Sequence, residues 1–163
     1  MASMTNSFLN GNGLALAISS GDQIFIYGPV YFILTTFSFL IGGVNAFSFR
    51  IINLFFAFLT IFIFYRIMGK LKINEVVKKL IVLMFLIDVI FIQNSHSGRM
   101  EFVATYFTLL CLFYYLKDKL TTIDYCLIAL FGSLAFMTTP RVAVILFPIL
   151  IFVFISLIKE RKW

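Results

Sequence analysis

The chain has 163 residues, of which 62% are hydrophobic and 12% charged, and its mean hydropathy is +1.06. Soluble domains carry about 25% charged residues and are less than half apolar, so this composition excludes a cytosolic enzyme and a disordered chain. The net charge of +6 does not indicate a nucleic-acid-binding domain, because the lysines lie between apolar runs rather than on a polar face. A membrane-spanning helix uses roughly 20 apolar residues, so the sequence predicts an integral membrane protein with about five such helices.

The first apolar segment, Tyr27–Ile41, is short and follows a stretch without Lys or Arg. A Gly-Pro pair and a Gly-Gly pair leave it about a dozen uninterrupted apolar positions, a length typical of interfacial or re-entrant segments. Pro29 suits the first turn of a helix, where its missing N–H costs nothing. We therefore predict an outer loop over residues 1–26, and an interfacial helix with an outer connection over residues 27–49. A cytoplasmic N-terminus with six crossings is the alternative.

Five longer apolar segments fill residues 50–163 and predict a single all-α domain, a polytopic membrane helix bundle. The segments are Ile51–Tyr65, Val76–Ile92, Phe102–Leu116, Ile123–Met137 and Val142–Ile158. Cytoplasmic loops are enriched in Lys and Arg. If all five segments cross, every lysine lies on one side, and only Arg50, Arg99 and Arg141 lie on the other. This asymmetry places the lysine side in the cytoplasm.

The three outer arginines are candidates for binding phosphate. Arg50 and Arg99 each precede a predicted helix, and Arg141 follows the Thr-Thr-Pro break before the last one. Arginine is preferred over lysine where a phosphate is held by paired hydrogen bonds. We predict a shared site for an anionic lipid headgroup or pyrophosphate. The alternative is three separate anchors that contact ordinary phospholipid.

Further candidates for the site lie beside these arginines. Asp88 interrupts an apolar run, and an acid in a membrane helix costs about 2.5–3.5 kcal/mol, so it predicts either a functional group or an interhelical pair with Arg99. Glu101 can accept a proton or orient a hydroxyl, or serve as the acid of a helix N-terminus. His96 is a candidate proton shuttle or ligand, or a plain loop histidine. No residue spacing predicts a metal site.

Two tyrosines flank Pro29 at the predicted outer interface, where amphipathic rings are favoured. Tyr27 and Tyr31 could contact a sugar face as part of the pocket or anchor the segment in the interface.

Three motifs follow one another in an order known from one family. They are YGPVYF at 27–32 with Phe49-Arg50, DVIF at 88–91 with SGRME at 97–101, and TTPR at 138–141. They resemble the "HPPL-Y … FG … R-psa", "DP-F … GRMD" and "THPR" elements of integral-membrane C-type glycosyltransferases. The group they resemble is family 39-like, which includes protein O-mannosyltransferases and aminoarabinose transferases. The resemblance covers most of the chain, from about Tyr27 to Ile158.

The resemblance implies transfer of a sugar from a polyprenyl phosphate in the bilayer to an acceptor glycan, lipid or protein on the extracytoplasmic face. We expect a bacterial inner membrane and no nucleic-acid partner. Arg50 and Arg99 would bind the donor phosphate, and Glu101 would help to arrange the pocket. The resemblance does not imply a particular cofactor. Whether a divalent cation takes part is left open.

The chain also departs from this family pattern. The family's catalytic acid follows a first transmembrane helix, often in an Asp-Glu pair, and this sequence has neither feature. Asp22 is the only acid before Arg50, so Asp22 and Glu101 are the catalytic candidates. Gly28 replaces a proline, and Glu101 an aspartate. We therefore expect a central slice of a longer enzyme, inactive alone.

Two other functions are compatible with the sequence. A non-catalytic accessory or lipid-binding membrane protein would not need the missing acid loop. A transporter could use Asp88 as a coupling acid, but no inverted repeat or pair of broken helices supports that reading.

Overall fold

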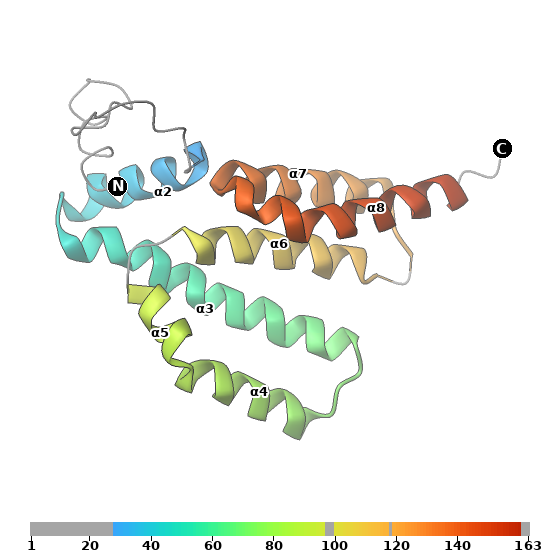
Figure 1. Ribbon diagram of the computed structural model, residues 1–163, viewed down its shortest axis with the longest axis horizontal. Helices are drawn as coiled ribbons and strands as arrows, with labels where there is room; N and C mark the ends of the chain where they lie inside the picture. Colours follow the sequence, from blue (N-terminus) through green and yellow to red (C-terminus); the bar gives the residue numbers. More distant parts are fainter. Residues whose placement is uncertain (1–27, 97–99, 118, 161–163) are drawn as a thin grey trace.

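The computed structural model describes residues 28–96, 100–117 and 119–160, and the regular structure in these ranges is entirely helical. The elements are α2 (Pro29–Gly42), α3 (Ala46–Lys70), α4 (Glu75–Ile87), α5 (Val89–His96), α6 (Glu101–Tyr115), α7 (Thr122–Thr138), the 3-10 turn η1 (Pro140–Val142) and α8 (Ala143–Glu160) (Figure 1). The predicted all-α fold is confirmed for these residues.

The helices form an elongated bundle with two chemically different ends (Figure 1). Helix α7 runs antiparallel to its neighbours α6 and α8, and α4 runs antiparallel to α3. The arginine end holds the first turns of α3 and α6, the end of α7, and η1, with Arg50 and Arg141. The lysine end holds the α3–α4 and α6–α7 connections, with the lysines from Lys70 to Lys79 and Lys117 and Lys119. These lysines and these two arginines, which the sequence separates, therefore lie at opposite ends of the folded bundle.

Helices α2 and α3 form a tight hairpin at the arginine end. Pro29 occupies the first turn of α2, and Gly43 ends it with φ +73°, a conformation that glycine adopts without steric cost. The Asn45 side chain caps α3 by accepting a hydrogen bond from the Ser48 N–H at 2.8 Å. The Ser38 hydroxyl donates to the Ser48 carbonyl at 2.6 Å across the hairpin. These contacts make α2 double back along the first half of α3.

The predicted segment Val76–Ile92 is not one continuous helix, because it breaks at Asp88. The backbone of Asp88 is extended there, with φ −64° and ψ 119°. Its Oδ2 accepts a hydrogen bond from the Phe91 N–H at 3.1 Å, which caps the start of α5. Aspartate competes with helical hydrogen bonding in this way and favours caps over helix interiors. The acid that seemed costly inside a helix therefore lies at a helix end.

Lysines at the lysine end tie the helix termini together. The Lys70 ammonium donates to the Phe113 carbonyl at 2.6 Å and lies 3.8 Å from the Phe113 ring centroid, which joins the ends of α3 and α6. Lys78 pairs with Glu75. Hydrogen bonds donated to Glu75 by Lys78 and by the Tyr65 hydroxyl hold the pKa of this carboxyl below its usual range.

The α6–α7 connection is closed by a second ion pair. Lys117 lies 2.5 Å from the buried carboxylate of Asp124 in the first turn of α7. Thr121 and Asp124 form a reciprocal capping box at the start of that helix. These bonds fix the turn between the two helices.

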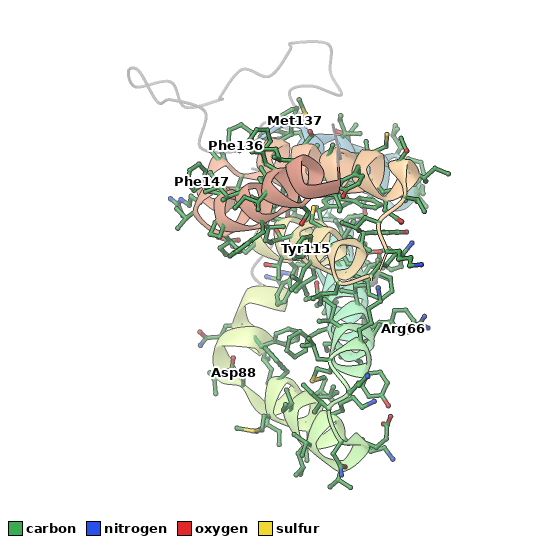
Figure 2. All side chains as sticks on the ribbon, turned by 90° about the vertical axis from the view of Figure 1, so that its right-hand side faces the viewer. Arg66, Asp88, Tyr115, Phe136, Met137 and Phe147 are labelled. Atoms are coloured by element: carbon green, nitrogen blue, oxygen red, sulfur yellow. The ribbon has the colours of Figure 1, made fainter. Side chains whose placement is uncertain are left out.

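Much of the outside of the bundle is apolar. More large hydrophobic side chains are exposed than buried, and Figure 2 shows Phe136, Met137 and Phe147 on the outer faces of α7 and α8. A soluble monomer rarely exposes so large a contiguous apolar surface.

One described helix, α3, is long and apolar enough to cross a membrane. Four more apolar helical stretches are shorter: Pro29–Gly42, Glu101–Tyr115, Thr122–Thr138 and Pro140–Ser156. Length and composition thus identify one candidate crossing among the described residues, not the five that we predicted.

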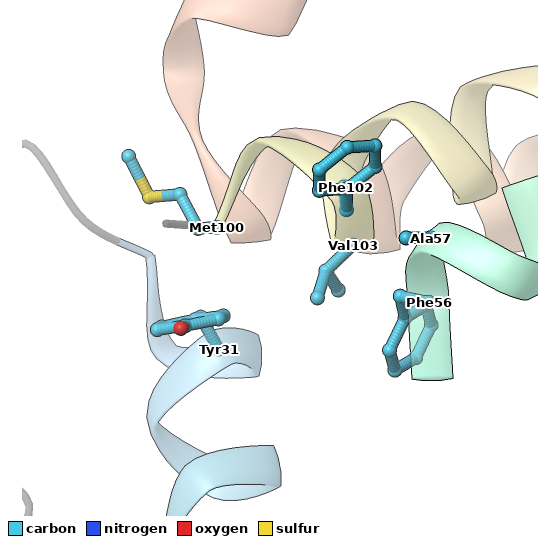
Figure 3. Packing of buried hydrophobic residues seen from close by; sticks show 6 residues of the cluster. All are labelled: Tyr31, Phe56, Ala57, Met100, Phe102 and Val103. Atoms are coloured by element: carbon cyan, nitrogen blue, oxygen red, sulfur yellow. The ribbon is translucent and has the colours of Figure 1, made fainter. Parts of the chain in front are cut away.

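The main core cluster joins α2, α3 and α6 (Figure 3). Its buried members are Tyr31, Phe56, Ala57, Met100, Phe102 and Val103. This packing fixes the start of α6, and with it Glu101, against the middle of α3.

Candidate functional site

A cavity of about 320 Å³ lies between α3, α4, α5 and α6. Its polar lining comes from Asp88, Glu101, Thr60 and Thr105, and the rest is apolar. The apolar lining residues are Ile61, Phe64, Val82, Phe85, Phe91, Phe102 and Leu109. The fold thus brings Asp88 and Glu101, which are separate sequence candidates, to the walls of one cavity.

Glu101 enters the cavity from the first turn of α6. The positive end of the helix dipole favours a carboxylate at this position. The Thr60 hydroxyl lies 3.5 Å from the Phe102 carbonyl and places this turn beside the middle of α3. The Oε2 atom of Glu101 is buried and has no hydrogen-bond partner among the described residues. A buried carboxylate oxygen without a donor is costly, so it is a ready acceptor for a ligand.

Asp88 reaches the cavity from the break between α4 and α5, where Figure 2 labels it. Its hydrogen bond to the Phe91 N–H fixes the direction of the carboxylate. No Lys, Arg or His is among the described residues that line the cavity. Among the described lining residues, the charged groups are therefore acids and most of the others are apolar.

Four phenylalanine rings form a continuous edge-to-face series along the cavity. The ring centroids are 5.2 Å apart for Phe64 and Phe85, and 5.8 Å apart for Phe85 and Phe91. The Phe91 and Phe102 centroids are 4.7 Å apart. Because these rings belong to α3, α4, α5 and α6, their packing joins all four helices that enclose the cavity.

Two of the three arginines in the predicted phosphate site belong to the described residues, and their grouping stays a prediction. Arg50 is exposed in the second turn of α3, and Arg141 is exposed in η1. Thr60, which lies level with the start of α6, follows Arg50 by ten residues, or roughly 15 Å along the helix axis. The described structure therefore does not bring Arg50 to the Glu101 cavity. Arg99 lies outside the described residues.

Tyr31 lies in the core rather than at an outer surface, which corrects its expected role. It is completely buried, and its hydroxyl accepts a hydrogen bond from Asn53 Nδ2 at 2.9 Å. A residue in this position cannot contact a sugar face or an interface. Tyr27 and Asp22 lie outside the described residues. His96 is the last residue of α5, and the structure does not describe its side chain.

Two motifs that are distant in the sequence meet at the arginine end. The Gly28 N–H donates to the Thr138 carbonyl at 3.0 Å, which joins the start of α2 to the end of α7. A side chain at position 28 would overlap the Met137 carbonyl. Thr139, directly before η1, is buried, and within the described part of the chain its hydroxyl has no hydrogen-bond partner. Gly28, where the family pattern has a proline, thus allows the main chain before α2 to contact the main chain at the end of α7.

The described residues contain no group of three or more His, Cys, Asp or Glu side chains suited to a metal ion. Sequence reasoning missed Thr60, Thr105 and the phenylalanine series as cavity residues. Each of these two threonines places a polar hydroxyl inside a predicted apolar segment, and this contrast could have identified them from the sequence.

No family model, curated protein or solved structure matches the chain. Function is therefore inferred from the cavity and from the motifs gathered at the arginine end.

Proposed function

We propose that the chain is the membrane part of a glycosyltransferase that moves a sugar from a polyprenyl phosphate to an acceptor. The supporting observation is the meeting of the first and third motifs, which are far apart in the sequence. Gly28 of the first motif donates a hydrogen bond to Thr138 of the third, beside Arg141, and the two halves of the second motif place Asp88 and Glu101 in one cavity. Residues from different motifs that converge in space are expected of one functional site.

In this proposal the helices form a membrane bundle with about five crossings, and α2 lies at the outer interface. The exposed apolar surface and the separation of the lysines from Arg50 and Arg141 support this arrangement. The lysine end faces the cytoplasm of a bacterial inner membrane. The arginine end then faces the exterior, where lipid-linked sugars are used.

The proposed chemistry is a displacement at the anomeric carbon of the donor sugar. An acceptor oxygen forms the new bond to that carbon and loses its proton to Glu101, whose buried Oε2 is available as an acceptor. The bond to the phosphate oxygen breaks, and its electron pair leaves with the polyprenyl phosphate. Arg99 and Arg141 would stabilise the departing phosphate, with Arg50 farther along the donor.

Arg99→Ala tests this proposal. We expect transfer of radiolabelled sugar from a polyprenyl phosphate to fall at least about tenfold in membranes that contain the protein, because an arginine–phosphate bond contributes at least about 1.4 kcal/mol. The full-length gene product is the form to assay. Arg66→Ala is the matched control, because Arg66 is an exposed arginine toward the lysine end.

Equal transfer by wild type and Arg99→Ala, at equal protein levels, would remove the phosphate site from the proposal. Absence of transfer by wild type, together with retained binding of polyprenyl phosphate, would favour the accessory or lipid-binding reading.

A further inference from the structure

The connection between α3 and α4, at the lysine end of the bundle, is strongly basic (Figure 1). Residues 66–79 include five lysine and arginine side chains and a single acid, Glu75. That acid is already paired with Lys78, which is buried. The ion pairs of the described residues leave out three exposed basic side chains, Arg66, Lys72 and Lys79. The connection therefore presents an excess of positive charge to its surroundings.

Lys72 has a backbone conformation that is unusual for a lysine. It lies in the left-handed region with φ +56°, directly after the C-cap of α3. Its N–H donates to the Gly69 carbonyl at 3.1 Å, and the Ile73 N–H donates to the Met68 carbonyl at 3.2 Å. These bonds form a Schellman motif, in which glycine is the usual residue at this position because a Cβ atom is strained there. The fold alone therefore favours glycine, and strain of this kind is typical of functional positions.

Exposed apolar side chains lie beside these charges. Leu71 directly precedes Lys72 and is 55% exposed, and Val76, in the first turn of α4, is 65% exposed. A membrane interface accommodates this combination, because apolar side chains enter the acyl region while basic side chains reach the phosphate groups. The charges alone would also suit an acidic protein, whereas the apolar side chains beside them favour a lipid surface.

We propose that the α3–α4 connection binds the headgroups of anionic phospholipids in the cytoplasmic leaflet. The negative surface potential of that leaflet attracts basic segments that lie beside membrane helices. This inference rests on the proposed orientation of the bundle, with the lysine end in the cytoplasm, and it does not depend on sugar transfer. The bound phospholipid is distinct from the polyprenyl phosphate donor, whose phosphate belongs at the arginine end.

A matched pair of lipids tests the requirement for a negative headgroup. Palmitoyl-oleoyl phosphatidylglycerol and palmitoyl-oleoyl phosphatidylcholine have the same acyl chains, but only the first carries a net negative charge. Native mass spectrometry of the purified protein, released from a non-ionic detergent, gives the dissociation constant of each lipid. We expect phosphatidylglycerol to bind at least about tenfold more tightly, because several basic side chains contribute. Equal affinities, or no binding of phosphatidylglycerol, would overturn the proposal.

Substitutions at Lys72 assign the binding to this connection. Lys72→Gly removes the charge and relieves the strain, so the affinity for phosphatidylglycerol should fall about fivefold while the unfolding temperature rises. Lys72→Arg keeps the charge and should keep the affinity. Lys119→Gly is the matched control, because it removes an exposed lysine from the α6–α7 connection and should leave the affinity unchanged.

An unchanged affinity of Lys72→Gly would contradict the proposal, because this variant is expected to fold at least as well as the wild type. Equal losses from Lys72→Gly and Lys119→Gly would also overturn it, because they would indicate attraction by the net charge of the chain rather than binding at this connection. The sugar-transfer assay of Arg99→Ala is independent of both results, so the two proposals can fail separately.

Discussion

Replacing Gly28 with alanine is expected to destabilise the bundle by about 3 kcal/mol, the upper part of the usual range for overpacking. The added methyl carbon would lie 1.5 Å from the Met137 carbonyl oxygen and 2.2 Å from its carbon. These are main-chain atoms of α7, so no side-chain rotation can relieve the overlap. The start of α2 must then move away, and the bond from the Gly28 N–H to the Thr138 carbonyl is lost.

Thermal unfolding in detergent, followed by size-exclusion chromatography, measures this effect. Gly69→Ala is the matched control, because a methyl group there meets only the Lys78 ammonium at 3.9 Å. Alanine is also the better helix former, so this control should match or slightly exceed the stability of the wild type. A Gly28→Ala protein as stable as the wild type would show that α2 does not dock against α7 as described.

Met100→Ala should also lower stability by about 3 kcal/mol, within the range measured for truncating large core residues. Met100 is only 2% exposed and belongs to the cluster that joins α6 to α2 and α3 (Figure 3). Its truncation leaves a void between these helices. Because Met100 directly precedes Glu101, the change should also loosen the wall of the acidic cavity.

Met84→Ala provides the comparison for Met100→Ala. Met84 is 71% exposed on α4, so its truncation leaves no internal void and should change the unfolding temperature little. Similar losses from the two substitutions would contradict the described core, because they would imply similar burial of the two side chains.

Helix positions follow closely from the sequence because apolar segments and charged loops alternate regularly. The predicted segment Ile123–Met137, for example, differs from α7 by one residue at each end. The break at Asp88 was missed because apolar residues on both sides suggested a continuous helix. At Asp88 the backbone is extended and the carboxylate accepts a hydrogen bond from the Phe91 N–H, which divides the segment.

The candidate site was only partly predictable for a different reason. Asp88 and Glu101 are conspicuous as acids in an apolar chain, so composition alone singled them out. Their shared cavity depends on how α3, α4, α5 and α6 pack, which short-range patterns do not encode. The burial of Tyr31 likewise depends on tertiary packing, because Asn53, which donates a hydrogen bond to it, lies on another helix.

We propose that the arginine end faces the exterior and that the lysine end faces the cytoplasm. Single cysteines at exposed positions 44, 72 and 119, in a chain without Cys111 and Cys126, test it with a membrane-impermeant maleimide on intact cells. We expect Val44→Cys to be labelled in intact cells. Lys72→Cys and Lys119→Cys should be labelled only after permeabilisation. Labelling of the lysine-end cysteines in intact cells, or of all three cysteines alike, would contradict this topology.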